Sequence, residues 1–114
     1  GETHEQVFDV SWSDPDQRTR GADGKVPSVG SSVNEREATY TNAIGAPILT
    51  GYWKDPAFDP TQKAFYYVRV MEIPTPTWLA YDRKNYNLHD EMPATAPYTS
   101  QERAYTSPIW YNPS

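Results

Sequence analysis

Two histidines are the first candidates for chemistry in this 114-residue chain. His4 and His89 form no His-x-His pair, and no spacing gathers three ligands around either one. The chain has no Gly-x-Ser-x-Gly elbow and no recognisable Ser-His-Asp arrangement. Asp55 and Asp59 each precede a proline, where aspartate is an ordinary turn former, although a carboxylate pair for glycoside hydrolysis would depend on a distance that sequence does not show. We assign no catalytic residue and no cofactor, and we expect this chain not to be an enzyme by itself.

The aspartates of one turn-rich segment suggest calcium. Asp14, Asp16 and Asp23 lie in residues 13–32, which also hold several glycines and prolines. An EF-hand loop closes with a glutamate at its twelfth position, where this sequence has Lys25. We therefore interpret the segment as a solvated loop and assign no metal ligand in it.

Two arginines are candidates for binding an anion. Arg69 sits in an otherwise apolar run, and Arg103 follows Glu102. A guanidinium offers a bidentate fork to phosphate or carboxylate, so either arginine could clamp a substrate held by a neighbouring catalytic domain. A cross-strand ion pair, or a stem that covers an aromatic ring, is the structural alternative, and we prefer it for both residues.

Aromatic side chains could form a platform on which sugar rings stack; those considered are Trp53, Trp78, Tyr81, Tyr98 and Trp110. Core packing explains Trp53 and Trp110 better, because both belong to expected strands. The other three fall in proline-rich connections. They stay candidates for a ligand surface or a domain contact.

The element expected to position these groups is a central strand over residues 64–73. Its aromatic and β-branched side chains alternate with a period of two. The face that carries Tyr66, Val68 and Val70 suits a core, whereas the face that carries Arg69 is expected to be only partly covered.

Further elements are expected on both sides of this strand. The pattern predicts strands at residues 6–12, 38–41, 46–53 and 103–111, with a helical turn at residues 34–37. Residues 78–86 have mixed spacing with a partly helical face, and residues 88–101 read as an extended excursion. Phe58 is expected to pack beneath the loop that contains it, residues 55–60. The fold class is therefore all-β, an antiparallel sandwich of the immunoglobulin or fibronectin type with long proline-rich loops and room for one short helix.

Composition narrows the possible roles. The length predicts one domain, residues 1–114, whose core is rich in aromatics because 14% of residues are Phe, Trp or Tyr. A net charge of −5 repels phosphate backbones and anionic lipid headgroups, so nucleic acid and membrane surfaces are not expected partners. There is no cysteine and no apolar stretch long enough to span a membrane.

Three blocks of unusual sequence carry a family resemblance: ATYTNAIGAP at residues 38–47, FYYVRV then EIPTP within residues 65–76, and QERAYTSPIWY at residues 101–111. They resemble the C-terminal end of a large bacterial family known as domain of unknown function 3604. VFDVSWS at residues 7–13 and DGK at residues 23–25 are similar to that family too. The resemblance thus covers nearly the whole chain in the right order.

The resemblance implies a longer parent protein with an upstream metal-dependent hydrolase-like domain, similar to the polymerase-and-histidinol-phosphatase phosphoesterases. A divalent metal would be held there, and none of that domain's ligands can be matched to this chain. We therefore expect the C-terminal, non-catalytic β-domain of a bacterial periplasmic or secreted protein, which packs on the catalytic domain and shapes its cleft. A bare sheet edge would also permit self-association.

The alternative is a carbohydrate- or small-ligand-binding module that uses the aromatics of its loops. The residues expected to contact a ligand or a domain are Arg103, Trp78, Tyr81, Tyr98 and Arg69.

Overall fold

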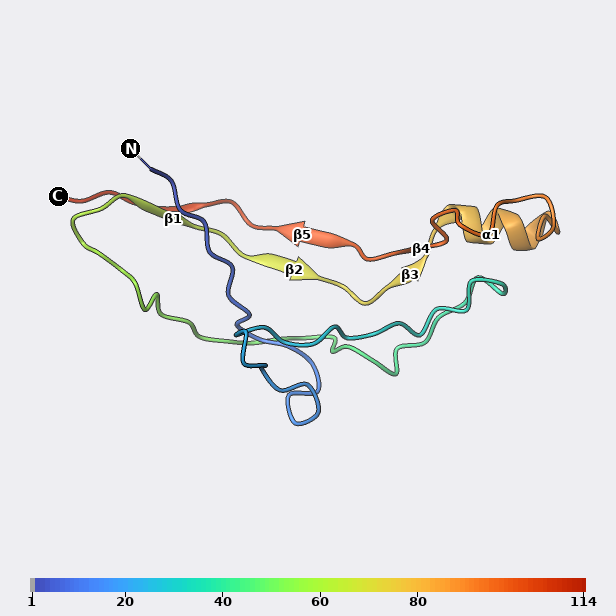
Figure 1. Cartoon of the computed structure of the whole chain (residues 1–114), viewed down its shortest axis with the longest axis horizontal. Helices are drawn as coiled ribbons and strands as arrows, with labels where there is room; N and C mark the ends of the chain where they lie inside the picture. The colour runs from blue at the N-terminus through green and yellow to red at the C-terminus, as the bar shows by residue number, and fades with distance from the viewer. Residues whose placement is uncertain (1) are drawn as a thin grey trace.

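The longest feature of the chain is an antiparallel ribbon that runs out through residues 64–76 and back through residues 99–111 (Figure 1). The structure is a computed structural model and describes residues 2–114. The outgoing arm holds β1 (Ala64–Tyr66), β2 (Arg69–Met71) and β3 (Thr75–Pro76), and the returning arm holds β4 (Thr99–Ser100), β5 (Arg103–Tyr105) and β6 (Ile109–Tyr111). They pair as three two-stranded antiparallel sheets, β1 with β6, β2 with β5 and β3 with β4. The expected central and last strands therefore exist, but each is broken into short pieces.

The first break in the ribbon is a bulge beside Pro108. Between the β1–β6 and β2–β5 ladders the outgoing arm has Tyr67 and Val68, whereas the returning arm has residues 106–108, one residue more. The amide of Val68 donates to Oγ1 of Thr106 at 2.9 Å, and the amide of Thr106 donates to the carbonyl of Val68 at 2.9 Å. Pro108 has no N–H to add to the ladder, which is why pairing lapses here.

The second break lies on the opposite arm and restores the register. Residues 72–74 of the outgoing arm face only Gln101 and Glu102. The amide of Glu72 still donates to the carbonyl of Glu102 at 3.0 Å, and Pro74 supplies no donor. The two extra residues sit on opposite arms, so their offsets cancel and the ribbon runs on to the helix.

Helix α1 (Trp78–Asn85) joins the two arms at one end of the ribbon (Figure 1). Arg83 and Lys84 in its last turn favour the negative end of the helix dipole. Two residues after the helix, Asn87 lies in the left-handed region at φ 54°. There the amide of Asn87 donates to the carbonyl of Lys84, and the amide of Leu88 donates to the carbonyl of Arg83, which caps the helix end. The single short helix that the sequence allowed is confirmed. Within residues 2–114 no helix has the length and apolar character needed to cross a bilayer.

The buried core is small and lies beneath α1. Its fully covered hydrophobic residues are Ala38, Ala80 and Tyr98, with Leu79, Met92 and Ala96 packed against them. Ala38 comes from the tip of a second, narrow hairpin, where Asn34 and Thr39 form an isolated antiparallel bridge. The helical turn expected at residues 34–37 is wrong, because these residues form the turn of that hairpin. The brief strand expected at residues 38–41 is reduced to the single bridge at Thr39.

Two further expected strands, at residues 6–12 and 46–53, are also wrong. Neither segment has strand structure, although the two run beside each other. The hydroxyl of Ser11 donates to the carbonyl of Thr50 at 2.8 Å, and the rings of Phe8 and Trp53 lie 4.8 Å apart. The two segments are in contact, but their backbones do not pair into a ladder. Residues 13–32 contain only turns, as expected.

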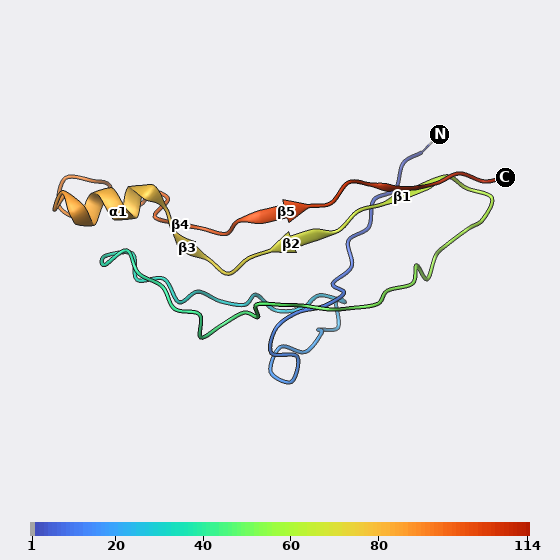
Figure 2. The ribbon, with the colours of Figure 1, turned by 180° about the vertical axis from the view of Figure 1, so that it is seen from behind.

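The second hairpin runs along one side of the ribbon and not around it, as Figures 1 and 2 show from opposite sides. The molecule measures 62 × 34 × 25 Å, and its radius of gyration is 19.1 Å. A compact chain of this length has a radius of gyration of about 13 Å. The described part of the chain is thus elongated and mostly surface.

The face of the ribbon expected to form a core is open. Val68 is 57% exposed and Val70 47% exposed, while Tyr66 is half-buried. Trp110 was expected in a core, but it is 66% exposed, and Phe58 is exposed as well. These side chains lack cover because no other layer formed by residues 2–114 lies over them. The elements are mostly β, in small antiparallel sheets, with one short helix.

Candidate ligand and domain-contact surface

The two candidate arginines lie close together on one face of the β2–β5 ladder. Arg69 pairs with Tyr105, and Met71 pairs with Arg103. Residues paired across an antiparallel ladder share a face, as do residues two apart along a strand. Both arginines are exposed, and neither makes an ion pair or side-chain hydrogen bond with another residue of the described chain. The two arginines thus belong to one exposed face of the ladder.

A row of aromatic rings continues this face along the ribbon. We call it the aromatic stripe; it consists of Trp110, Phe65, Tyr67 and Tyr105. The ring centroids are 5.1 Å apart for Trp110 and Phe65, 6.3 Å for Phe65 and Tyr67, and 6.1 Å for Tyr67 and Tyr105. Phe65 and Tyr67 are nearly parallel, with 12° between their planes. The stripe is an exposed aromatic strip that ends at the two arginines.

Tyr67 links the stripe to the start of the chain. Its hydroxyl donates to Oε1 of Glu5 at 3.3 Å. The negative charge of Glu5, and then the hydrogen bond to it, raise the pKa of Tyr67, while the charge of Arg69 acts in the opposite direction. The phenol therefore keeps its proton at neutral pH and stays a donor.

The three candidate aromatics near α1 have different surroundings. Trp78 is 71% exposed at the first turn of the helix, and Tyr81 is exposed on the next turn. Tyr98 is only 1% exposed and packs in the core, where the guanidinium of Arg83 lies 4.4 Å from its ring centroid. Tyr98 therefore supports the helix, whereas Trp78 and Tyr81 face solvent.

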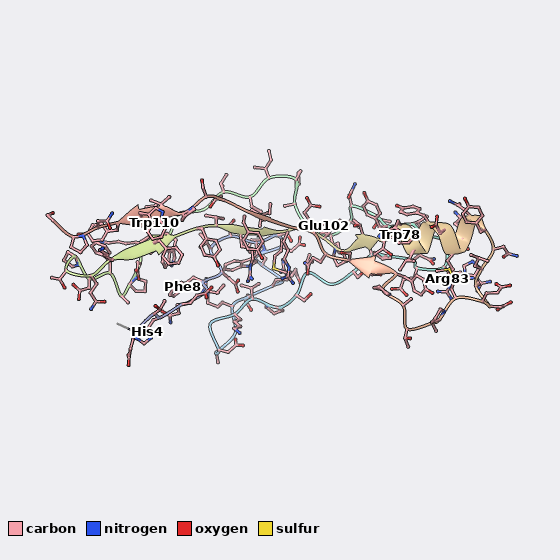
Figure 3. All side chains as sticks on the ribbon, turned by 90° about the horizontal axis from the view of Figure 1, so that it is seen from above. His4, Phe8, Trp78, Arg83, Glu102 and Trp110 are labelled. Carbon is pink, nitrogen blue, oxygen red and sulfur yellow. The ribbon has the colours of Figure 1, made fainter. Side chains whose placement is uncertain are left out.

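A hollow of about 420 Å³ lies where the ribbon meets α1. Figure 3 places Trp78 and Glu102 at this junction, with Trp110 at the far end of the ribbon. The residues that line the hollow are Pro76, Thr77, Trp78, Leu79, Pro97, Thr99, Ser100 and Glu102. The hydroxyl of Thr77 donates to the carbonyl of Pro97 and that of Thr99 donates to Glu35, both at 2.7 Å. Ser100, Glu102 and the indole of Trp78 are left to contact a ligand.

Sequence reasoning found Trp78 but missed its polar neighbours in this hollow. Ser100 and Glu102 follow Trp78 by more than twenty residues and come beside it only through the β3–β4 pairing of Thr75 with Ser100. The only sign of this hollow near Trp78 in the sequence was Pro76, the second of the two prolines before α1, because it marks the end of the outgoing arm.

The aspartates that suggested calcium take part in turns. The carbonyl of Asp14 accepts hydrogen bonds from the amides of Gln17 and Arg18, and Oδ1 of Asp23 accepts one from the amide of Lys25 at 3.1 Å. Across residues 2–114, no three His, Asp or Glu side chains gather closely enough to hold a metal ion.

Comparison with known proteins gives one family. A family model described as "Protein of unknown function (DUF3604)" matches residues 1–113. No curated protein and no solved structure matches the chain.

Proposed function

Because this chain belongs to the DUF3604 family, we propose that it is a non-catalytic β-domain that packs on an upstream, metal-dependent hydrolase-like domain of the same parent protein and shapes its cleft. A divalent metal would be bound by that upstream domain, and the parent would be a bacterial protein exported to the periplasm or the medium. The β-domain would supply shape and surface to chemistry carried out by its neighbour.

The observation that carries this proposal is the amount of exposed surface. The chain exposes 9293 Å². A compact protein of 13.0 kDa exposes about 6,300 Å², so the excess is about 3,000 Å². A permanent interface buries roughly 2,000 Å² or more in total. The excess is enough for such an interface, and a chain with so small a core needs one to be stable.

The exposed hydrophobic side chains lie where a partner could cover them. They lie along both faces of the ribbon and along the segments beside it, and the largest exposures include Val7, Ile48, Tyr52, Val68, Ile109 and Trp110. Exposed hydrophobic side chains that gather on neighbouring segments mark a surface suited to contact with another protein or domain. The finer fold follows from the same reasoning: covering the face of Tyr66, Val68 and Val70 would make it one inner face of an immunoglobulin-like sandwich with long proline-rich loops.

The arginine face gives the proposed contact a chemical role. Arg69 and Arg103 stand together without a partner in the described chain, and arginine binds phosphate and carboxylate through two parallel N–H donors. We propose that this face borders the cleft, where the two guanidinium groups bind an anionic substrate.

Hydrogen exchange on the parent protein and on the isolated chain tests the packing. We expect the backbone amides of β2 and β5 to exchange slowly in the parent and quickly in the isolated chain. The isolated chain should also hydrolyse no phosphoester when manganese or zinc is added. Equal protection of these amides in both proteins, or metal-stimulated turnover by the isolated chain, would refute the proposal.

A second candidate function rests on the hollow beside α1. A flat indole as exposed as that of Trp78, next to the hydroxyl of Ser100 and the carboxylate of Glu102, suits a sugar ring that stacks on one side and hydrogen-bonds at its edge. Titration with a panel of glycans, comparing Trp78→Ala with the matched control Tyr86→Ala, tests it. No binding at millimolar glycan would count against this role.

A further inference from the structure

A second hollow, of about 340 Å³, lies near β1, at the end of the ribbon away from α1 (Figure 1). Its lining residues are Trp53, Lys54, Asp55, Phe58 and Tyr66. Three of these five are aromatic and one is a carboxylate. We call Trp53, Asp55, Phe58 and Tyr66 the aromatic cage.

The walls of the aromatic cage are held in place by ring contacts with one another and with residues outside it. Trp53 packs on Phe8 at 4.8 Å between ring centroids, and it meets Tyr66 at 6.1 Å with the planes at 61°. Phe58 meets Tyr111 at 4.9 Å with the planes at 73°. Because these rings are already oriented, a ligand would lose little free energy in ordering them.

The charge of the cage comes from Asp55, and its hydrogen bonds are already formed. Oδ2 accepts from the hydroxyl of Tyr66 at 2.7 Å, and Oδ1 accepts from the amide of Ala57 at 2.8 Å. The carboxylate thus lies beside the rings in a fixed position. The faces of aromatic rings are also electronegative, so both components attract a cation.

We propose that the aromatic cage binds the quaternary ammonium group of a small soluble organic cation, a molecule of the choline class. A trimethylammonium group has no N–H to satisfy, and its methyl shell packs on aromatic faces while its charge interacts with the rings and with Asp55.

Two competing ligands fit the cage less well. A sugar would bring several hydroxyl groups, yet Asp55 and Tyr66 already hydrogen-bond within the chain, and unpaired hydroxyls are costly to bury. An anion would be repelled by Asp55. Lys54 carries a positive charge, but its flexible stem lets the ammonium stay in water. Among residues 2–114 the cation–π contacts are made by Arg20 and Arg83, and not by Lys54.

This inference does not depend on the proposed function, since all the cage walls belong to this chain. The test is calorimetric titration of this protein with choline chloride. Its control ligand is 3,3-dimethylbutan-1-ol, which has the same shape without the charge. The variants are Phe58→Leu, which removes an exposed wall, and Asp55→Asn, which removes the charge but keeps an acceptor for Tyr66. Tyr86→Leu, which removes an exposed aromatic ring outside the cage, is the matched control.

We expect choline to bind at millimolar concentration or below, and the neutral alcohol to bind at least about fivefold more weakly. Phe58→Leu and Asp55→Asn should each weaken choline binding about fivefold or more, while Tyr86→Leu leaves it unchanged. Circular dichroism of each variant verifies that it folds. Three results would each overturn the proposal: equal affinity for choline and the alcohol, no choline binding by the unsubstituted protein, or unchanged affinity in both cage variants.

Discussion

The hydroxyl of Tyr66 on β1 donates a 2.7 Å hydrogen bond to Oδ2 of Asp55, eleven residues earlier in the chain. This bond ties the turn after residues 46–53 to the ribbon, at a place where the backbones form no ladder. It is the main cause of the raised pKa of Tyr66, with smaller contributions from burial and from the charge of Asp55. Together with the ring contact of Phe58 with Tyr111, this bond connects the two halves of the chain at this end.

The pH dependence of stability should reveal this bond. Because the folded-state pKa of Tyr66 is raised, its contribution is complete below the unfolded pKa of about 10 and is lost as pH rises through the folded value. Tyr66→Phe should therefore remove part of the fall in melting temperature above that pH. Tyr52→Phe, at an exposed position, is the control. The same alkaline fall in all three proteins would show that Tyr66 contributes nothing.

Tyr98 should be the most sensitive core position. It is the largest fully buried side chain of the described residues, and α1 rests on it. Tyr98→Ala should lower the free energy of unfolding by about 3–5 kcal/mol, whereas Tyr98→Phe, which loses only the hydrogen bond to the carbonyl of Pro93, should cost about 1 kcal/mol. Urea unfolding measures both. The exposed Tyr86→Ala is the control, and a similar loss in it would contradict the assignment.

Gly45 should tolerate no side chain. Its φ is +79°, and a Cβ there would lie 2.5 Å from Cγ2 of Ile73, just after β2. Gly45→Ala should therefore destabilise by more than the roughly 1–2 kcal/mol expected of the left-handed backbone alone. Gly24→Ala is the matched control, because it has the same φ and open space around it. Equal losses in thermal unfolding would mean that Ile73 moves aside freely.

Thr106 should hold the first bulge of the ribbon together. Its Oγ1 accepts the amide of Val68, which has no other partner at that point. Thr106→Val should cost about 1 kcal/mol and speed hydrogen exchange at the Val68 amide, since the donor is left unpaired. Thr106→Ser keeps the hydroxyl, so its Val68 amide should exchange at the rate of the unsubstituted protein. If the valine variant exchanges no faster, the bulge does not depend on this bond.

Part of the fold could be predicted, because it depends on local chemistry. The β-branched and aromatic run around Val68 and Val70 does form strands, and the proline-rich ends of the arms do interrupt them. Residues 13–32 form turns, as their glycines and prolines indicated. The short helix at Trp78 has the spacing and the basic last turn that suit one.

The candidate site could be predicted only in part. Trp78, Tyr81, Arg69 and Arg103 are on the surface, as a ligand or domain contact requires, but Tyr98 is buried. The residues next to Tyr98 in the sequence are similar in type to those next to the other candidates. Its burial depends on the tip of a hairpin sixty residues away, which brings Ala38 against it. No local pattern reports such a contact.

The sequence by itself determined the strand and turn chemistry, the acidic charge and the family blocks, because each depends on neighbours along the chain. Only the tertiary structure decided that residues 6–12 and 46–53 run side by side without a ladder, and that the face of Val68 stays open. Alternation states which way side chains point. It does not state which backbone arrives to pair with them, or whether another layer covers them, because both depend on segments remote in sequence.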